Sequence, residues 1–416
     1  MSVIQAPKGT FDVLPADQTR RALLQHQAER IFLRAGYRRI ETPTFESTEL
    51  FARGVGASTD IVQKEMYSFD DGGGRSLTLR PEGTAPVCRA YLEHGMHKLP
   101  QPVKFWYLSS FFRAEAPQRG RYRQFWQVGA EMIGSAAPEA DAELVLLLAE
   151  LLEAMGVREP RLRISSLGTP ATRAAYREEL TAFLRAHQDG LSPEVVARIE
   201  LNPLRAFDSD DARTRETMRS APLLLDRLTD EDAEHFAAVR ACLDGQELPY
   251  EVDPTLVRGL DYYTRTLYEF ESSALGAQSA LGGGGRYDGL IEQLGGKPTP
   301  GTGWAAGVER ILLAAPASSE VAPAVDLFVA LATPQAAGQA FQLAAQARRA
   351  GMAAQAELAG RSLKGQLKQA DRLGARYVAI ISEEPLISLK NMESSEQVEV
   401  EAASVIPTIL RSSRLI

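Results

Sequence analysis

The stretch that decides the fold is KFWYLSSFFRAEAPQRGRYRQFWQVGAEMIG, residues Lys104–Gly134. Aromatic and apolar residues fill two segments of it, Lys104–Glu115 and Gln124–Ile133, which predict two β-strands. Between them, Ala116–Arg123 contains three arginines, a proline and a glycine, a composition typical of a loop. The stretch is therefore predicted to form an antiparallel hairpin with a basic loop at its tip.

Side chains alternate between the two faces of a strand, so this period divides the charges of the hairpin. One face carries Phe111, Arg113 and Glu115 from the first segment, and Phe125, Gln127, Gly129 and Glu131 from the second. The opposite face carries Trp126, Val128, Ala130 and Met132. Unpaired buried charges are costly, so the charged face favours either a polar, partly aromatic ligand or a structural ion pair of Arg113 with a carboxylate.

The pattern F-R-x-E, a basic loop and then R-x-R-Q-F-x-Q-x-G-x-E resembles motif 2 of the class II aminoacyl-tRNA synthetases, in the form of the histidyl-tRNA synthetase family. The resemblance implies that Arg113 holds the α-phosphate of ATP, Phe125 stacks on adenine and Glu115 reads the adenine amino group. It also implies that the loop binds the acceptor end of tRNA through Gln118, Arg119, Arg121 and Arg123. The chain departs from the family pattern at Ala114, Ala116 and Trp126.

A second segment, LVRGLDYYTRT at Leu256–Thr266, matches a signature of the same family over eleven consecutive residues. The match implies that Arg258 screens the repulsion between the histidine carboxylate and the α-phosphate. It implies further that the histidine side chain is read by Glu131, Tyr262 and Tyr263. The alternative for Arg258 is a structural pair with Asp261 that braces the turn.

LTLRPEGTAPVCRA, Leu77–Ala90, predicts a strand that ends in a turn and leads into a helix. Glu82, Gly83 and Thr84 lie at that turn. A carboxylate and a hydroxyl placed there can either cap the helix or bind an ammonium group. The R-P-E-x-T pattern resembles the family's histidine site, which implies that these residues hold the α-amino group of histidine together with Gln127.

Two further motifs extend the resemblance. GTGWAAGVERILLA, Gly301–Ala314, resembles motif 3, which implies that Arg310 contacts the γ-phosphate of ATP. Its glycines are predicted to let a strand and a helix approach closely. A helix over about Ala16–Ala35, followed by an extended stretch centred on Pro43, resembles motif 1, which forms the dimer interface of the family. The alternative for that stretch is the edge strand of a monomer.

From Pro323 onward, strands and helices alternate and predict a small, mostly parallel α/β domain. Its predicted helix Arg361–Gly374 carries one basic stripe, formed by Arg361, Lys364, Lys368 and Arg372. Such a stripe is often only a solvated face. The sequence pattern GRSLKxQLKxAD resembles the anticodon-binding domain of the family. The resemblance implies that these four side chains contact tRNA.

Composition sets the outer limits of the interpretation. The chain has 416 residues, 44% of them hydrophobic and 24% charged, as in ordinary globular proteins. No segment has the pattern of a signal peptide or membrane span, and the two cysteines, Cys88 and Cys242, do not have zinc-site spacing. The net charge of −8 argues against general affinity for nucleic acids, although local basic patches can still bind one. A cytoplasmic protein without a zinc site is expected.

Together the motifs predict an α+β catalytic domain with a mixed, largely antiparallel sheet, a helical insertion and a small C-terminal α/β domain. The expected parts are residues 1–168 and 249–322 for the catalytic core, 169–248 for the insertion and 323–416 for the anticodon-binding domain. The implied function is attachment of histidine to tRNA(His) through a histidyl-adenylate, by a homodimer that uses ATP with Mg²⁺. The alternative is a non-catalytic regulatory subunit of ATP phosphoribosyltransferase, a paralogue that lacks the C-terminal domain.

Overall fold

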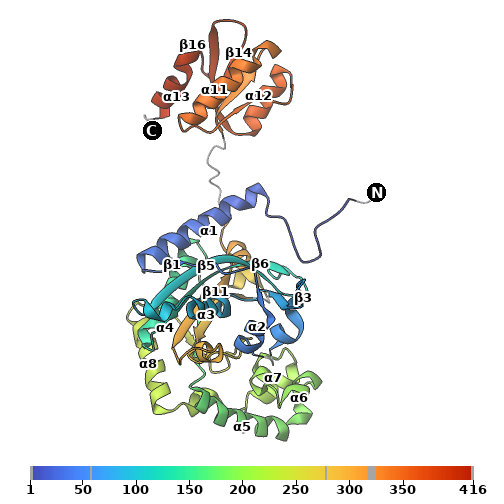
Figure 1. Cartoon of the computed structure of the whole chain (residues 1–416), viewed down its shortest axis with the longest axis vertical. Helices are drawn as coiled ribbons and strands as arrows, with labels where there is room; N and C mark the ends of the chain where they lie inside the picture. The colour runs from blue at the N-terminus through green and yellow to red at the C-terminus, as the bar shows by residue number, and fades with distance from the viewer. Residues whose placement is uncertain (1–2, 57–58, 277–278, 317–324, 414–416) are drawn as a thin grey trace. The chain divides into compact units, whose positions relative to one another are not determined.

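The computed structural model describes residues 3–56, 59–276, 279–316 and 325–413 of the chain. The structure divides into two compact units, Met1–Pro316 and Ala317–Ile416 (Figure 1). The domain boundary expected between residues 322 and 323 lies outside the described residues. No helix in the described part of the chain is long and apolar enough to cross a membrane.

The N-terminal unit is built on an eight-stranded sheet with the order β1-β5-β6-β11-β10-β9-β7-β8. Its strands are β1 (Arg38–Arg39), β5 (Val103–Phe112), β6 (Gln124–Ile133), β7 (Arg161–Ser166), β8 (Glu251–Val252), β9 (Thr264–Glu271), β10 (Ala280–Arg286) and β11 (Gly301–Gly307). Neighbouring strands are antiparallel except for the short pairs β1/β5 and β7/β8. The predicted mixed, largely antiparallel sheet is confirmed.

The central hairpin has the predicted register, with Phe111 opposite Phe125 and Ser109 opposite Gln127. Its first strand, however, ends at Phe112 and not at Glu115. Beyond that point the amide of Ala114 donates to the carbonyl of Glu65, outside the hairpin, at 2.8 Å. The chain therefore leaves the ladder where a third segment competes for its backbone hydrogen bonds.

Each face of this sheet is covered by helices, as Figure 1 shows for α1 across one side. The first face packs against α1 (Pro15–Arg34), α4 (Pro138–Ala154), α8 (Asp230–Asp244) and α10 (Val308–Ala314). The second face packs against α3 (Thr84–Glu93) and α9 (Leu290–Gln293), and α2 (Thr48–Gly54) packs on these two helices. Val128 and Ala130 of β6 face the first group of helices and are fully buried. The charged side of the hairpin thus faces α3.

A small sheet with the order β2-β4-β3 stands beside the main one. It contains β2 (Phe45–Ser47), β3 (Tyr67–Asp70) and β4 (Ser76–Leu79), and the π-helix η1 (Ile61–Glu65) lies between β2 and β3 in the sequence. Arg80, which follows β4, donates to the carbonyls of Ser110, Thr42 and Pro43. This buried arginine fixes the turn before α3 against the main sheet.

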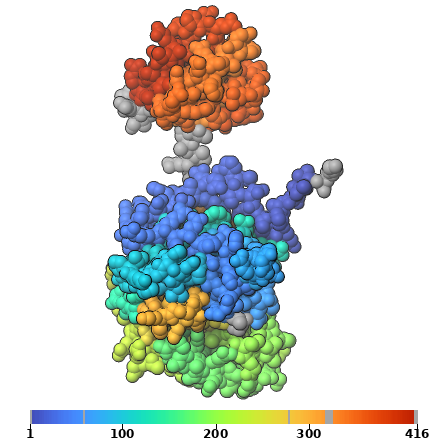
Figure 2. All heavy atoms as spheres, in the orientation of Figure 1, coloured from blue at the N-terminus to red at the C-terminus, as the bar shows by residue number. Residues whose placement is uncertain are grey.

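Residues 169–248 are helical, as predicted, and Figure 2 shows most of them gathered in green at one end of the N-terminal unit. Besides α8 they form α5 (Pro170–Ala186), η3 (Gln188–Gly190), α6 (Pro193–Arg198), η4 (Pro203–Asp208), α7 (Ala212–Met218) and η5 (Leu224–Arg227). Thr169, Ser192, Asp211 and Thr229 cap these helices through their side chains. The last helix, α8, buries Phe236 and Val239 in the central core.

The C-terminal unit is a five-stranded sheet with the order β13-β12-β14-β15-β16. It contains β12 (Val325–Leu331), α11 (Ala337–Arg349), β13 (Ala354–Ala356), α12 (Leu363–Arg372), β14 (Ala375–Ile381), β15 (Leu386–Asn391), β16 (Gln397–Glu401) and α13 (Val405–Ser413). Two strand pairs are parallel and two antiparallel, so the sheet is mixed and the expectation of a mostly parallel sheet is wrong. The last three strands follow each other through loops too short for a parallel crossover.

Candidate active site

A cavity of about 520 Å³ opens on the charged side of the hairpin. Seven of the residues singled out in the sequence line it: Arg113, Glu115, Arg121, Phe125, Gln127, Arg258 and Arg310. They come from the hairpin, from the turn before β9 and from α10. The fold therefore brings motifs that are distant in the sequence together around one cavity.

Arg113 is positioned by a hydrogen bond and by an aromatic ring. Its Nε donates to the carbonyl of Pro81 at 2.9 Å, and its guanidinium carbon lies 5.3 Å from the ring centre of Phe125. Glu115 lies between two cations, 3.7 Å from Arg113 Nη1 and 3.2 Å from Arg121 Nε. The structural ion pair considered for Arg113 is therefore present, but it is long and lies at the cavity wall.

Arg310 is the third residue of α10, as its predicted place early in a helix requires. Its Nε donates to the carbonyl of Gly120 in the basic loop at 3.0 Å, and its Nη1 donates to the carbonyl of Ala280 at 2.5 Å. Burial, together with the nearby charge of Arg121, lowers the pKa of Arg310. The Arg310 guanidinium is thus a desolvated cation, and both of these hydrogen bonds go to backbone carbonyls.

Arg258 forms its ion pair with Glu269 of β9, where the sequence had suggested Asp261 as the structural partner. Both side chains line the cavity. Gly283 of β10 makes room beneath them, since a Cβ on it would come within 3.3 Å of the Arg258 guanidinium carbon. Arg258 is therefore a cation on the sheet face, held by a strand carboxylate.

Glu131 lies fully buried beside the cavity and accepts three hydroxyl hydrogen bonds. The donors are Thr84 Oγ1 at 2.7 Å, Tyr107 at 3.3 Å and Tyr287 at 2.7 Å. Burial raises the pKa of Glu131 to about 8, although the three hydroxyl groups oppose that shift. Gly303 makes room for this carboxylate, because a Cβ there would lie only 1.7 Å from Glu131 Oε2. The sequence predicted that this glycine lets a strand approach a helix, whereas it lies against the neighbouring strand β6.

Glu82 caps helix α3 with both carboxylate oxygens. It accepts from the amides of Thr84 and Ala85 at 2.7 and 3.0 Å. Burial raises the pKa of Glu82, and these amide bonds together with the charge of Arg113 oppose the shift. The capping alternative is therefore present in the structure, while the role in holding an ammonium group stays a prediction, as it does for Gly83 and Thr84.

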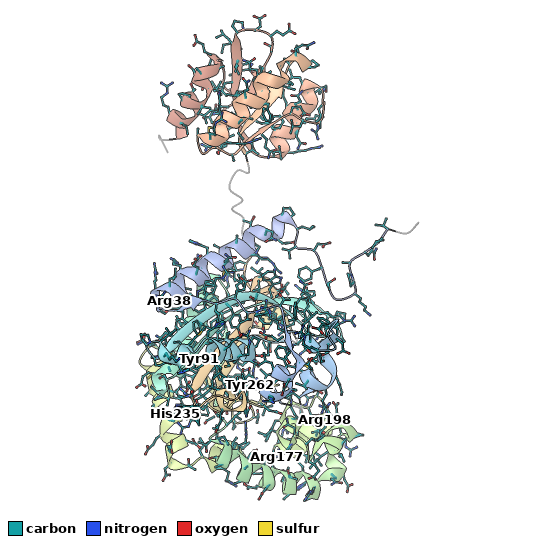
Figure 3. The ribbon with its side chains drawn as sticks, in the orientation of Figure 1. Arg38, Tyr91, Arg177, Arg198, His235 and Tyr262 are labelled. Atoms are coloured by element: carbon teal, nitrogen blue, oxygen red, sulfur yellow. The ribbon has the colours of Figure 1, made fainter. Side chains whose placement is uncertain are left out.

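Four buried tyrosines surround this part of the site. Tyr262 and Tyr263 were predicted, and their ring centres lie 4.7 Å apart in the interior marked by Tyr262 in Figure 3. Tyr107 and Tyr287, which both donate to Glu131, were not predicted. Tyr107 stands opposite Gly129 in the hairpin register, so the period of two, which identified Glu131, could have included it.

The residues predicted to contact tRNA lie in two places. In the loop, Gln118, Arg119 and Arg121 are exposed, but the Arg123 guanidinium is bound to the carbonyls of Glu115 and Lys8. All four predicted basic residues are exposed, Arg361, Lys364, Lys368 and Arg372, but α12 begins at Leu363 and not at Arg361 as predicted, and Arg361 pairs with the buried Glu357 at 3.3 Å. Arg121, Arg123 and Arg361 thus have internal partners.

Pro43, predicted at the dimer interface, is exposed next to the small sheet. Phe45 of β2 and Phe69 of β3 lie beside each other there with ring centres 6.3 Å apart. They remain 51% and 45% exposed, although β4, the strand between β2 and β3, brings the two rings to the same surface. This surface is an apolar patch on a sheet.

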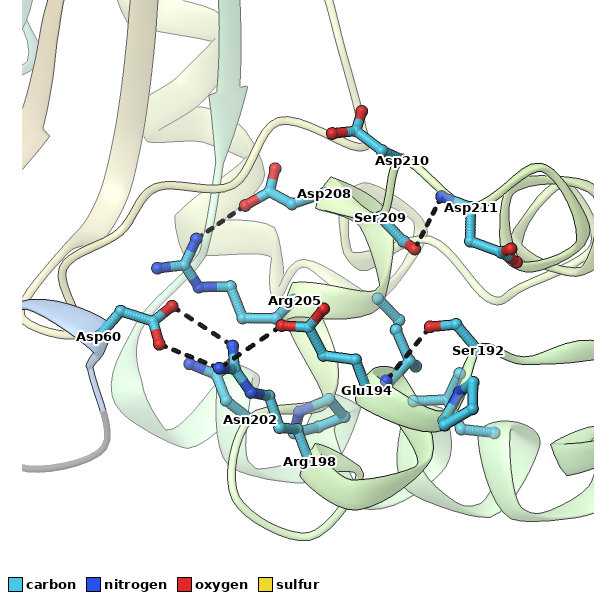
Figure 4. A pocket seen from close by; sticks show the side chains of 15 residues that line it. Asp60, Ser192, Glu194, Arg198, Asn202, Arg205, Asp208, Ser209, Asp210 and Asp211 are labelled. Carbon is cyan, nitrogen blue, oxygen red and sulfur yellow. Dashed lines mark hydrogen bonds and ion pairs between the residues drawn. The ribbon is translucent and has the colours of Figure 1, made fainter. Parts of the chain in front are cut away.

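A second cavity, of about 590 Å³, is lined by residues between Leu184 and Asp211 of the helical stretch and by Asp60 (Figure 4). Arg198 of α6 binds Asp60, and Arg205 pairs with Asp208 at 2.9 Å, as the dashed lines show. Asp60, Arg205 and Asp208 also line the first cavity. Sequence motifs gave no signal for these residues, since the helical stretch resembles nothing distinctive. They place the insertion at the edge of the candidate site.

Comparison with known proteins gives two family matches. Residues 9–311 match the model described as histidyl-tRNA synthetase, and residues 326–412 match the anticodon binding domain. A histidine–tRNA ligase of Rubrobacter xylanophilus is 48% identical over 94% of this chain and 95% of its own length. One from Halothermothrix orenii is 45% identical over 97% and 98%. Among solved structures, apo histidyl-tRNA synthetase of S. aureus superposes with a TM-score of 0.81 at 35% identity, covering 98% of this chain and all of that one.

The raised pKa of Glu131 predicts a pH-dependent stability. The folded chain holds this proton up to about pH 8, whereas the unfolded chain loses it near pH 4.5. Between these values unfolding releases a proton, so the contribution of Glu131 to the free energy of unfolding should fall by about 1.4 kcal/mol per pH unit. Subtracting denaturant curves of Glu131→Gln from those of the wild type isolates this slope.

The contribution should be complete below pH 4.5 and flat above about pH 8. The exposed Glu292→Gln serves as the control for replacing a glutamate by glutamine at the surface. A constant difference between wild type and Glu131→Gln from pH 5 to 8 would contradict the assignment of the proton.

Proposed function

The chain belongs to the histidyl-tRNA synthetase family, and we propose how its cavity performs the reaction of that family, the ATP-dependent attachment of histidine to tRNA. The chain is thus an aminoacyl-tRNA ligase. The regulatory-subunit alternative is not favoured, because the relatives named histidine–tRNA ligase match nearly the full length, including the anticodon-binding domain.

The observation that carries the proposal is the convergence of Arg113, Arg258 and Arg310 with the partly buried ring of Phe125 in a single cavity. We propose that adenine stacks on Phe125 beside Glu115, because an aromatic face suits a base. Arg113 then holds the α-phosphate and Arg310 the γ-phosphate, since a planar guanidinium matches phosphate oxygens. Arg310 would exchange its bond to the Gly120 carbonyl for the phosphate.

Arg258 is assigned to the chemical step. A carboxylate oxygen of histidine attacks the α-phosphorus, a new P–O bond forms, and the bond to pyrophosphate breaks. The two reacting groups are both anionic, and charge builds on the phosphoryl oxygens as they approach. A guanidinium held on the sheet face by Glu269 can neutralise that charge without losing its own proton. A hydroxyl of the tRNA 3′ end then takes the histidyl group and releases AMP.

Histidine selection is assigned to the buried cluster beside this step. We propose that Glu131 and Tyr263, with Tyr262, read the imidazole ring, while Glu82, Gly83, Thr84 and Gln127 hold the α-amino group. Gln127 lines the cavity, and its side-chain oxygen is buried with no hydrogen-bond partner among the described residues. A buried acceptor without a donor is costly, so it supports a ligand ammonium group at this position.

Two accompanying features are part of the proposal. ATP would enter with Mg²⁺, because the carboxylates of Glu115 and Glu269 at the cavity wall are the oxygen ligands that Mg²⁺ takes alongside phosphates. The bound ion would neutralise phosphate charge. Among the described residues no group of three or more His, Cys, Asp and Glu side chains could hold a metal ion on its own. The proposed place of action is the cytoplasm.

Transfer requires tRNA(His), which we propose binds at two patches. The exposed loop residues Gln118, Arg119 and Arg121, with Arg123 behind them, would receive the acceptor end. The stripe of α12 would bind the anticodon region. Both patches are basic in a chain of net charge −8, which supports local recognition over general affinity.

Homodimer formation is proposed through the surface around Pro43. Phe45 and Phe69 leave an apolar patch on a small sheet that water would otherwise cover. A two-fold interface buries the same patch on both copies, which suits a flat sheet face.

Arg258→Ala should lower the rate of histidine-dependent ATP–pyrophosphate exchange by roughly 10²–10³, the usual effect of removing one electrostatic stabiliser. The wild-type chain should catalyse this exchange, and absence of it would refute the proposed function. The double variant Arg258→Ala, Glu269→Gln separates catalysis from bracing, because it leaves no unpaired carboxylate. It should recover melting temperature and remain inactive. Recovery of activity would show that Arg258 only neutralises Glu269.

Lys364→Glu with Lys368→Glu should weaken tRNA binding and flatten its salt dependence, because phosphate contacts release counterions. Exchange activity, which needs no tRNA, should stay at the wild-type level. Filter binding across a salt series measures the first effect. Arg349→Glu on α11 is the control, an exposed arginine of the same unit outside the stripe. Equal loss in the control and the α12 variant would remove the special role of the stripe.

Phe45→Glu should shift the chain from dimer to monomer in sedimentation experiments at micromolar concentration, because it places a charge on the proposed two-fold contact. The control Phe341→Glu changes a phenylalanine of the C-terminal unit that is 61% exposed, and should leave the assembly unchanged. A wild-type chain that is monomeric and fully active under the same conditions would contradict the dimer proposal.

A further inference from the structure

Trp126, one of the departures from the family pattern, has no place in the proposed reaction. It alternates with the site residues of β6 and therefore faces the helices on the opposite side of the sheet. There its ring is covered by Arg21 of α1, whose guanidinium carbon lies 5.5 Å from the ring centre. The same guanidinium lies 6.0 Å from the ring of Phe11, so Arg21 stands between two aromatic side chains.

Arg21 also forms an ion pair with Glu309, and both side chains are largely buried, 13% and 8% exposed. The other oxygen of Glu309 accepts a hydrogen bond from the amide of Trp126 at 3.1 Å. That amide lies one residue beyond the last pair of β6 with β11, Gln127 with Gly307. The carboxylate of Glu309 therefore accepts the backbone hydrogen bond that follows the last β6–β11 pair, and it links β6 to α10.

Glu309 is the residue before Arg310 and lines the nucleotide cavity itself. Burial raises the pKa of its carboxyl group, and the Trp126 amide and Arg21 oppose that shift. Any charge on Glu309 that lacks a partner would act on the phosphate end of the cavity. Such a charge would repel a polyphosphate.

The segment before α1 holds the basic loop from the same side. The amide of Arg123 donates to the carbonyl of Gly9 at 2.7 Å, and the rings of Phe11 and Tyr122 lie 4.6 Å apart. Gly9 has φ +87°, and a Cβ on it would come within 2.7 Å of the Arg123 side chain. The N-terminal segment thus contacts the loop and Arg21 at once.

We propose that Arg21 is a positioning residue for nucleotide binding, which neutralises Glu309 at the cavity wall and fixes α10, with Arg310, against β6. The inference rests on the proposed nucleotide role of the cavity. The rings of Phe11 and Trp126 hold the planar Arg21 guanidinium between them by cation–π attraction. Arg21 is therefore kept in one position. Arg21 itself touches no substrate.

The test is Arg21→Met, which keeps the length of the side chain and leaves Glu309 without its cation. Exchange kinetics should show a KM for ATP raised by about tenfold, with kcat and the KM for histidine changed by less than about threefold. Arg21→Lys keeps the charge and should restore most of the ATP affinity. The double variant Arg21→Met, Glu309→Gln removes the unpaired carboxylate and should bring the KM for ATP back toward that of the wild type.

Arg20→Met is the matched control. Arg20 neighbours Arg21 on α1 and binds the carbonyls of Leu312 and Ala315 at the other end of α10, at 2.5 and 3.1 Å. Its loss should lower the melting temperature and leave the KM for ATP unchanged. An unchanged KM in Arg21→Met, or a double variant no better than the single one, would overturn the inference. Lack of exchange in the wild type would instead refute the proposed function.

Discussion

A carboxyl group in the middle of a sheet needs a partner on every side, and Glu131 finds them on four segments of the chain. Thr84 comes from the turn before α3, Tyr107 from β5 and Tyr287 from the end of β10. Gly303 of β11 leaves the space for the carboxylate. Because an unsatisfied group at this depth is costly, these four segments must meet here before the cavity can form.

The arginine side chains of the cavity are held by backbone carbonyls and by a carboxylate of the protein itself. Arg310 donates to carbonyls of the basic loop and of β10, while Arg113 donates to Pro81 and Arg258 pairs with Glu269. Each guanidinium is thus fixed by the protein before a ligand arrives. Fixed charges need little reorganisation when charge develops on a phosphoryl group, which is the main source of electrostatic catalysis. The sheet provides the rigid base, since β6, β10 and β11 are neighbours in it.

Sequence reasoning identified the features that depend on local periodicity and on motifs. The period of two placed Phe125, Gln127 and Glu131 on one face, and the hairpin register confirms it. It could not foresee partners from distant segments, such as Glu269 for Arg258 or the Gly120 carbonyl for Arg310. The end of β5 at Phe112 was missed for the same reason, because the competing carbonyl belongs to Glu65. Tertiary contacts decide these points, and no local pattern records them.

The departures from the family pattern at Ala114 and Trp126 lie in different surroundings. Ala114 stands where the chain turns from β5 toward the carbonyl of Glu65, in the part of the chain that leads into the basic loop. Trp126 lies on the opposite face, where its ring packs against Arg21. A departure from the family pattern in the tRNA-binding motif, such as Trp126, can therefore affect the residues that hold the site in place and not the contacts with tRNA. The same strand carries both roles, because successive residues of β6 face the ligand side and the helix side in turn.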